Sequence, residues 1–427
     1  MNTPNFAGPI PTRRALRITL AAVCIAVGFA LAGPLTPPAG TVTSTYKTLS
    51  EVEPRIPINA ANAPGDVNSL FRITQRGSYY LVGNITGVAG KHGIEIAAPN
   101  VTLDLNGFAL VGVAGMGEFD GILSVADVEN VSVLNGAVSG WGRRGIDLRT
   151  AHVCRLDGLS ASHNGNAGIS AGHQTALTAC IATENAAGGI DTGEYCSLVA
   201  CNAVSNGGWG IWAGGVSTLS GCSAYDNANI GIGVDPACTL TGCAAYWNAT
   251  SGIYAGTGCT ITQCTALSNF EDGIFATRGS IISYCSVGGN DGFGIGAGHG
   301  STVIWCTVRE NKLDGIECSS SCHISNNTCS SNGFGVANSG ANIFANGGDN
   351  RIEHNNCVDA DRGIDIDATG NIILGNSCAG NTINYTIVAG NRYGPIIDIT
   401  ASGTAAANGS SAAGTLGSTD PNANFAY

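Results

Sequence analysis

A repeat of 21 residues is the feature that most restricts what this chain can fold into. A Gly-Ile pair recurs from Gly168-Ile169 to Gly315-Ile316, with a spacing of 21 residues seven times in succession. Related pairs extend the series at Gly93-Ile94, Gly121-Ile122, Gly145-Ile146, Gly335-Val336 and Gly363-Ile364. A fixed period of this length indicates a repeat architecture, in which each unit buries its apolar face against its neighbours.

Other residues keep the same register as the Gly-Ile pair. An asparagine stands four residues before the glycine, at Asn164, Asn185, Asn206, Asn227, Asn248, Asn269, Asn290 and Asn311. A cysteine stands twelve residues after it, at Cys180, Cys201, Cys222, Cys243, Cys264, Cys285 and Cys306. A partial cysteine column, interrupted by serines, lies seven residues after it, at Cys196, Cys238, Cys259 and Cys322.

The composition of the unit favours strands over helices. A helical repeat needs a longer unit with a 3.6-residue apolar period. In residues 210–213, Gly-Ile-Trp-Ala, the isoleucine and the tryptophan instead point to opposite faces of a strand. Three short strands and three turns would make one coil of a parallel β-helix. Equivalent residues then stack ~4.8 Å apart, the isoleucines as core and the asparagines as a hydrogen-bonded ladder. We expect the glycine to serve a tight bend.

The Asn-x-x-x-Gly-Ile coil resembles the repeat of the pectin-lyase-like superfamily. The opening stretches, residues 73–81 and 101–107, also resemble the starts of secreted proteins of that kind. The resemblance covers residues 66–400 and implies an all-β fold, a single-stranded right-handed parallel β-helix of about 13–14 coils. It specifies a fold and leaves the activity open, because the superfamily holds lyases, hydrolases, epimerases and non-enzymes.

The 17 cysteines are interpreted as core residues. Thiols stacked in register would lie ~4.8 Å apart with parallel Cβ vectors, whereas a disulfide needs Cβ atoms ~3.8 Å apart. A linear stack also lacks the convergent tetrahedral arrangement of a zinc site. Off-register pairs, such as Cys318 with Cys322 or Cys329, could still form a bridge.

The ends of the chain predict export. Residues 1–32 read as a signal peptide, with Arg13, Arg14 and Arg17 before an apolar run and Ala30-Leu31-Ala32 as cleavage site. The Sec and twin-arginine routes both stay open, and an uncleaved anchor is the alternative. Residues 33–65 form a Pro-rich linker, and residues 401–427 a flexible tail whose last residues could cap the solenoid. After cleavage no membrane span remains, and we expect a secreted or cell-surface protein.

Two irregular steps and the net charge narrow the function. Steps of 28 residues predict loops at 113–119 and 338–349. A net charge of −12 with 18 basic residues excludes generic nucleic-acid binding, which needs clustered Lys and Arg. The acidic balance also disfavours direct binding of a polyanion, unless a divalent cation bridges the two.

An aromatic series lies two residues past the glycine, at an outward position. Trp212, Tyr254 and Phe275 would span three coils, ~14 Å, and present ring faces suited to sugars. The alternative is ordinary packing beneath a loop. We call these three residues the aromatic track.

Two clusters could serve a lyase of the resembled superfamily, which uses acidic Ca²⁺ ligands and an Arg or Lys base. The candidate bases are Arg144 and Arg362. The candidate calcium ligands are Asp120, Asp147, Asp361, Asp365 and Asp367. A surface network of ion pairs is the favoured alternative for both clusters.

Motifs of the superfamily's hydrolases are incomplete. Gly298-His299-Gly300 is present, but Arg351-Ile352-Glu353 has Glu where Lys belongs, which favours a lyase over a hydrolase. Two hypotheses remain. The protein binds extracellular polysaccharide and cleaves it as a Ca²⁺-dependent lyase, or it is a non-catalytic structural or adhesive rod.

Overall fold

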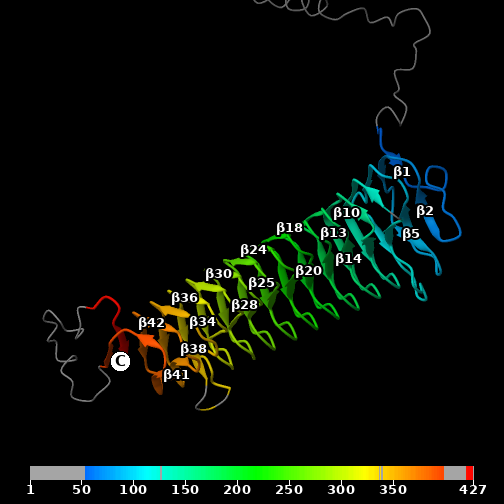
Figure 1. The fold of residues 1–427 in the computed structure, drawn as a ribbon. Helices are drawn as coiled ribbons and strands as arrows, with labels where there is room; N and C mark the ends of the chain where they lie inside the picture. The colour runs from blue at the N-terminus through cyan, green and yellow to red at the C-terminus, as the bar shows by residue number, and fades with distance from the viewer. Residues whose placement is uncertain (1–52, 126, 336, 338–339, 399–419, 427) are drawn as a thin grey trace, which may run out of the picture. The chain divides into compact units, whose positions relative to one another are not determined.

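The computed structural model describes residues 53–125, 127–335, 337, 340–398 and 420–426. The predicted signal peptide therefore lies outside the described residues, as do most of the linker and of the tail. Residues 55–427 form one compact unit, a solenoid of stacked parallel strands (Figure 1). Within the described residues no helix has the length and apolarity that crossing a bilayer requires.

One face of the solenoid is a parallel sheet of fifteen strands, which we call sheet B. Its strands are β2 (Ser69–Ile73), β5 (His92–Ile96), β8 (Ile122–Ser124), β11 (Ile146–Leu148), β14 (Ile169–Ala171), β17 (Ile190–Thr192), β20 (Ile211–Ala213), β23 (Ile232–Val234), β26 (Ile253–Ala255), β29 (Ile274–Ala276), β32 (Ile295–Ala297), β35 (Ile316–Cys318), β38 (Ala341–Ala345), β41 (Arg362–Ile366) and β44 (Ile383–Ile387). The all-β prediction is confirmed, and the solenoid is longer than the predicted 13–14 coils.

The other strands form sheet A, which contributes two strands to a regular coil. The first set is β1 (Ile56–Pro57), β3 (Gly77–Tyr80), β6 (Val101–Asp104), β15 (Ala176–Thr178), β18 (Ser197–Val199), β21 (Thr218–Ser220), β24 (Thr239–Thr241), β27 (Thr260–Thr262), β30 (Ile281–Ser283), β33 (Thr302–Ile304), β36 (His323–Ser325), β39 (Arg351–Glu353), β42 (Ile372–Leu374) and β45 (Arg392–Tyr393). The second set is β4 (Ile85–Thr86), β7 (Ala109–Val111), β16 (Ile181–Thr183), β19 (Asn202–Val204), β22 (Ser223–Tyr225), β25 (Ala244–Tyr246), β28 (Thr265–Leu267), β31 (Ser286–Gly288), β34 (Thr307–Arg309), β37 (Thr328–Ser330), β40 (Asn356–Val358), β43 (Ser377–Ala379), β46 (Ile396–Asp398) and β47 (Asn424–Ala426). β10 (Val131–Ser139) and β13 (Arg155–Ser162) run through both sets, and β9 (Val128–Glu129) pairs with β12 (Ala151–His152).

Each regular coil turns three corners, and each corner has one residue in the left-handed region. In the coil of β20 these residues are Val216, Gly221 and Asp226, with φ of 58°, 60° and 55°. The residue that follows each corner points inward, and equivalent residues stack into a ladder. The asparagine column and both cysteine columns therefore occupy equivalent places at the three corners.

The asparagine ladder is continuous and fully hydrogen-bonded. Asn206 Nδ2 donates to Asn227 Oδ1 at 2.9 Å and to the carbonyl of Ala182 at 3.1 Å, and the Asn206 backbone N–H donates to the same Asn227 Oδ1 at 3.0 Å. The side chains are buried. Each amide thus satisfies polar groups of two other coils, which ties neighbouring coils together.

The cysteines do more than fill the core. All sixteen cysteines of the described residues are buried and free. Cys222 Sγ donates to the carbonyl of Leu198 at 3.5 Å, and Ser217 N–H donates to Cys238 Sγ at 3.3 Å. The thiols thus repeat the bonding pattern of the asparagines in a weaker form. Beyond Cys306 the same column continues as Asn327, Asn355, Asn376 and Asn424.

The glycine column has a different cause from the predicted bend. None of the glycines from Gly168 to Gly315 in the 21-residue series has a positive φ. A Cβ on Gly231 would lie 2.5 Å from Asn248 Nδ2 and 2.7 Å from the carbonyl oxygen of Gly252. Glycine is required because the asparagine ladder and the next coil occupy the space that a side chain would need.

One irregular step differs from the expectation. Ile316 is aligned with Ile343, and Ile343 with Ile364, so Asn342 takes the place expected for Gly335. The extra residues precede β38 instead of following it, because Asn332 must first stack in the ladder, where its Nδ2 donates to Asn342 Oδ1 at 2.8 Å. The expected strand at Gly335-Val336 is therefore wrong, and Phe344 replaces Ala337 in the outward column. The other irregular step, Ile94 aligned with Ile122, is as expected.

Both ends are closed by chain segments. The first strand, β1, pairs with β3 and begins ten residues before the predicted start at residue 66. At the other end β47 pairs with β43 and β46. Asn424 completes the ladder by accepting from Asn376, and it lies fully buried. The last residues therefore cap the open end of sheet A, as predicted.

Candidate functional site

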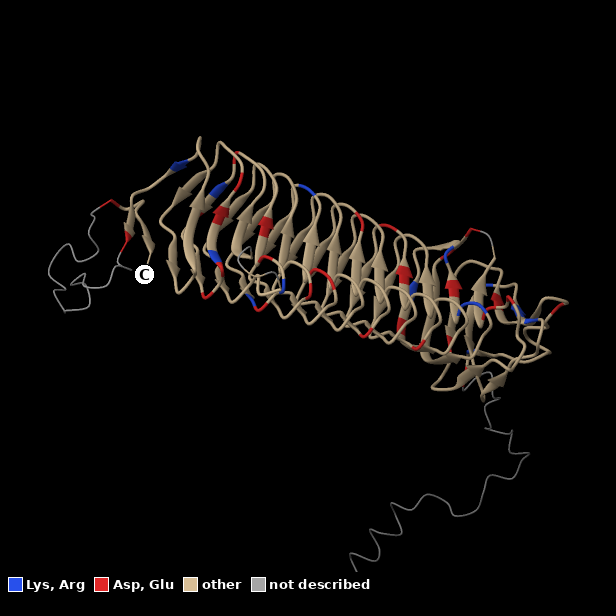
Figure 2. Cartoon of the chain, turned by 90° about the horizontal axis from the view of Figure 1, so that it is seen from below, with Lys and Arg blue, Asp and Glu red and all other residues tan. Residues whose placement is uncertain are grey.

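The outward column of sheet B carries a three-part pattern along the rod. Residues aligned across the strands include Asp147 and Asp191, then Trp212, Tyr254 and Phe275, then Glu317 and Asp365. Figure 2 shows acidic residues on strands toward both ends of this face, with an uncharged stretch between them. The aromatic track occupies that stretch.

The aromatic track forms a stack on an open face. The Trp212 and Tyr254 rings lie 6.2 Å apart at 21°, and the Tyr254 and Phe275 rings 5.9 Å apart at 16°. Trp212 reaches Tyr254 across an intervening coil because Gly233 has no side chain and the indole lies over it. Phe275 lies over Gly296 in the same way. The rings are half-buried, so part of each remains open to a ligand.

One further aromatic was missed at the sequence stage of reasoning. Trp209 lies just before the glycine of its coil and meets Trp212 edge-on, with ring centres 6.3 Å apart. A Cβ on Gly188 would lie 2.5 Å from Trp209 Nε1, so this ring leans toward the preceding coil. The signal was the column immediately before each glycine, which also holds Asp120, Asp272 and Asp314.

The first predicted cluster is a network of ion pairs around Asp147. Arg143 Nη2 lies 2.7 Å and Arg144 Nη1 3.4 Å from Asp147 Oδ2, and Arg149 donates to both oxygens at 2.9 Å. Burial alone would raise the pKa of Asp147, but the hydrogen bonds and charge of Arg149, with Arg144, hold it below its usual value. Arg149 was not predicted.

Asp120 lies beneath this network and is fully buried. Its Oδ1 accepts from the Arg144 backbone N–H at 2.9 Å, and Arg143 Nε lies 3.4 Å from the same oxygen. Burial raises the pKa of Asp120. Arg143 therefore contacts both carboxylates that were predicted as calcium ligands, and the predicted base Arg144 contacts Asp147. This is the ion-pair alternative weighed above.

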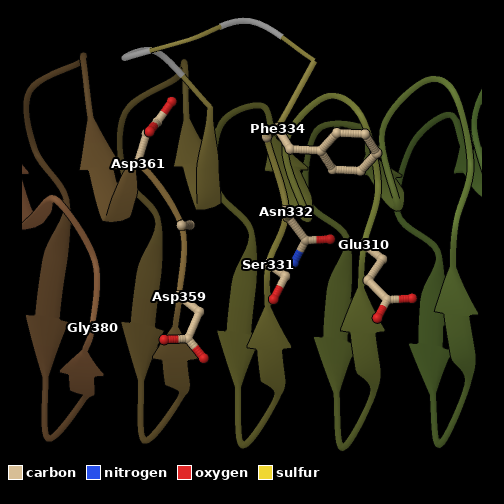
Figure 3. A pocket seen from close by; sticks show the side chains of 9 residues that line it. Glu310, Ser331, Asn332, Phe334, Asp359, Asp361 and Gly380 are labelled. Atoms are coloured by element: carbon tan, nitrogen blue, oxygen red, sulfur yellow. The ribbon is translucent and has the colours of Figure 1, made fainter.

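The second predicted cluster does not converge on one point. Arg362 is ion-paired with Asp365, a side chain that is only 2% exposed. Asp367 is exposed on the same coil. Asp361 instead lines a pocket of about 470 Å³ at the corner, with Glu310, Ser331, Asn332, Phe334 and Asp359 (Figure 3). Within the described part of the chain, no group of three or more His, Cys, Asp or Glu side chains is arranged to hold a metal ion.

A group of carboxylates not predicted as a site follows the aromatic track. Asp272, Asp314, Glu317 and Asp365 form what we call the carboxylate cluster. Burial is the first cause of a raised pKa in all four, and Asp314 reaches about 6. The charge of Asp365 adds to the effect on Asp314, and the charges of Asp314 and Asp272 add to it on Glu317. These mutual effects place the four groups in one neighbourhood.

Comparisons with known proteins agree with this architecture. A family model described as a right-handed β-helix region matches residues 120–312 and 235–383. No curated protein sequence matches.

Solved structures share the fold at low identity. The tailspike receptor binding domain of Siphovirus 9NA matches with a TM-score of 0.51 and 10% identity, covering 80% of this chain and 77% of that chain. A tailspike protein of E. coli bacteriophage HK620 matches with 0.50 and 11%, covering 80% and 79%. The A-module of an Azotobacter vinelandii mannuronan C-5 epimerase matches with 0.41 and 17%, covering 74% and 90%. Because the family model spans more than half of the residues, the chain belongs to the right-handed β-helix family.

Proposed function

We propose that this protein is exported and binds a polysaccharide along the face of sheet B. The observation that carries the proposal is the aromatic track, three half-buried rings stacked nearly parallel over about 14 Å of the rod. Sugar rings present C–H faces that pack on aromatic rings, and polar groups beside the rings fix orientation. The acidic residues at both ends of the track supply such groups.

The glycines of the face support the same function. Gly233 and Gly296 carry no side chain, so the aromatic rings lie down over them. The result is a broad apolar strip in line with the long axis of the solenoid. A linear polymer laid along that axis would meet one ring after another. Phage tailspikes share the fold, and one is described as a receptor binding domain, which is consistent with a binding role for such a rod.

Binding can be tested with two matched pairs of variants. Tyr254→Ala and Trp212→Ala remove rings of the track. Tyr246→Ala and Trp247→Ala remove the same residue types from β25 and its corner on sheet A. Affinity would be measured by calorimetry or affinity electrophoresis against neutral and acidic polysaccharides. We expect the track variants to weaken binding roughly tenfold, about 1.4 kcal/mol, and the controls to leave it unchanged. Equal losses in both pairs, or no binding to any polysaccharide, would contradict the proposal.

The finer hypothesis of a Ca²⁺-dependent lyase has a separate test. Its candidate bases, Arg144 and Arg362, are both ion-paired, and an arginine is not deprotonated at ordinary pH. Uronate polysaccharides would be incubated with Ca²⁺ and then with chelator, and unsaturated products followed by ultraviolet absorbance. Chelator-sensitive absorbance that is lost in Arg144→Ala or Arg362→Ala would support a lyase. A flat trace across the panel would exclude it.

A further inference from the structure

The aromatic track leads directly into the carboxylate cluster. Phe275 lies over Gly296, and the next residue of the outward column is Glu317 on β35. Asp314 lies three residues earlier, where the chain enters the same strand. A polymer that stacks on the rings would therefore continue over Gly296 to these two carboxyl groups. Both side chains are partly exposed, so a ligand can reach them.

Each carboxyl group is held in place through one oxygen. Asp314 Oδ1 accepts from the Ala341 backbone N–H at 2.6 Å, and Glu317 Oε1 accepts from Asn346 Nδ2 at 2.6 Å. Both donors belong to the following coil, so the coil that contains the inserted loop orients both acids. Such support fixes the geometry that catalysis needs.

A buried orphan group marks the same place as more than a collection of surface acids. Asp365 is ion-paired with Arg362 through Oδ2, yet its Oδ1 is buried without a hydrogen-bond partner. Its side chain is 98% buried, on the outward column two strands beyond Glu317, and its charge acts on Asp314. An unsatisfied buried oxygen costs stability, and such costs are typical of functional sites.

We propose that Asp314 and Glu317 are a catalytic pair that hydrolyses a glycosidic bond of an uncharged polysaccharide held on the aromatic track. This inference rests on the proposed function, because the track must first bind the substrate. Asp314 is the general acid and Glu317 the general base, while Asp365 is a positioning residue that acts through its charge on Asp314. The environments separate the two roles, since Asp314 has the more strongly raised pKa.

The reaction balances with water as the only co-reactant. The Asp314 carboxyl transfers its proton to the glycosidic oxygen as the bond from that oxygen to the anomeric carbon breaks. A water oxygen forms the new bond to the anomeric carbon, and Glu317 takes the proton that this water loses. The products are one new reducing end and one new hydroxyl group. Proton exchange with solvent then returns both carboxyl groups to their starting states.

The charge of the site selects the substrate class. The carboxylate cluster holds four acids, and Arg362 is paired within it. A uronate polymer would bring further negative charge to this place, where like charges repel. A neutral glycan avoids that repulsion. Its cleavage needs proton donation, which a carboxylic acid with a raised pKa can supply.

The experiment separates binding from cleavage. Wild type, Asp314→Asn and Glu317→Gln would be incubated with neutral glucans, mannans, galactans and xylans and with uronate polymers. Reducing ends, unsaturated ends and Kd would be measured on the same samples. Asp226→Asn and Glu184→Gln, which change exposed corner residues, are the matched controls. We expect reducing ends from a neutral polymer, no unsaturated ends, a 10²–10⁴-fold lower kcat in both site variants, and unchanged Kd.

A pH profile supplies a readout that a structural role would not change. Activity should fall as pH rises through about 6, because Asp314 then loses the proton it must donate. In Asp365→Asn this limb should move to lower pH, since a negative charge near Asp314 is removed. Binding without new reducing ends, unsaturated products, or wild-type rates in the site variants would overturn the catalytic pair and leave the proposed binding intact. Failure to bind any polysaccharide would refute both.

Discussion

The asparagine ladder makes a quantitative prediction at Asn248, in the middle of the regular region. Asn248 is fully buried. Its Oδ1 accepts from the backbone N–H of Asn227 at 3.2 Å and from Asn227 Nδ2 at 3.0 Å. Its Nδ2 donates to Asn269 Oδ1 at 3.0 Å and to the Ala224 carbonyl at 3.3 Å. Alanine at this position removes all four bonds.

The cost follows from the groups left without a partner. After Asn248→Ala, two donors of Asn227 and the carbonyl of Ala224 lose this partner inside the core. Each buried unsatisfied group costs ~1–3 kcal/mol, so we expect a loss of about 3–6 kcal/mol in the free energy of unfolding. Asn269 Oδ1 keeps its bond from the Asn248 backbone N–H, at 3.1 Å, and adds little to the loss.

Urea unfolding followed by circular dichroism measures this loss, with Asn229→Ala as control. Asn229 lies exposed two residues after the ladder, so the same substitution should cost less than about 0.5 kcal/mol. Hydrogen exchange adds a local readout, because the Asn227 amide should lose protection before distant coils do. Equal midpoints for the two variants, or an unchanged exchange rate at Asn227, would refute the reasoning.

Three further predictions concern the ladders, the cap and the carboxylate cluster. Burial raises the pKa of thiols such as Cys196, so the sixteen core cysteines should resist a thiol reagent in the native state and all react after unfolding; rapid native labelling would contradict the ladder. Asn424→Ala should lower Tm and promote end-to-end association, visible by light scattering, because it weakens the strand that covers the open end. Asp314 has a pKa of about 6 when folded against 3.8 as its ordinary value, so its stabilising effect is full below pH 4 and is lost as pH rises to 6. Asp314→Asn should therefore raise stability at pH 7, by at most ~3 kcal/mol, and flatten the pH dependence between 4 and 6; a less stable variant at pH 7 would contradict the assignment.

The stability and activity predictions for Asp314 run in opposite directions. The same substitution should abolish hydrolysis and stabilise the fold, because a partly buried carboxylate is costly at neutral pH. A residue kept only for structure would not show this opposition. The two measurements on one variant therefore distinguish a catalytic role from a structural one.

The period of the sequence by itself determined the architecture. Parallel strands place equivalent residues of successive coils above one another, so the recurrence of Ile, Asn and Cys predicts the stacked columns. The aromatic track followed from the same logic, because Trp212, Tyr254 and Phe275 occupy one column. Stacking along a repeat is a local rule, and the sequence contains all of its terms.

Only the tertiary structure decided which groups meet where the repeat is irregular or where side chains lean. The alignment of Phe344 depends on an inserted loop, whose position is set by the need of Asn332 for a ladder partner. The capture of Asp147 by Arg149 depends on side-chain directions that no column reveals. Asp272 and Asp365 lie 93 residues apart in the chain, yet both belong to the carboxylate cluster, because the coils between them stack at only ~4.8 Å each. Their raised pKa values come from burial, which depends on the packed neighbours and so exists only in the folded solenoid.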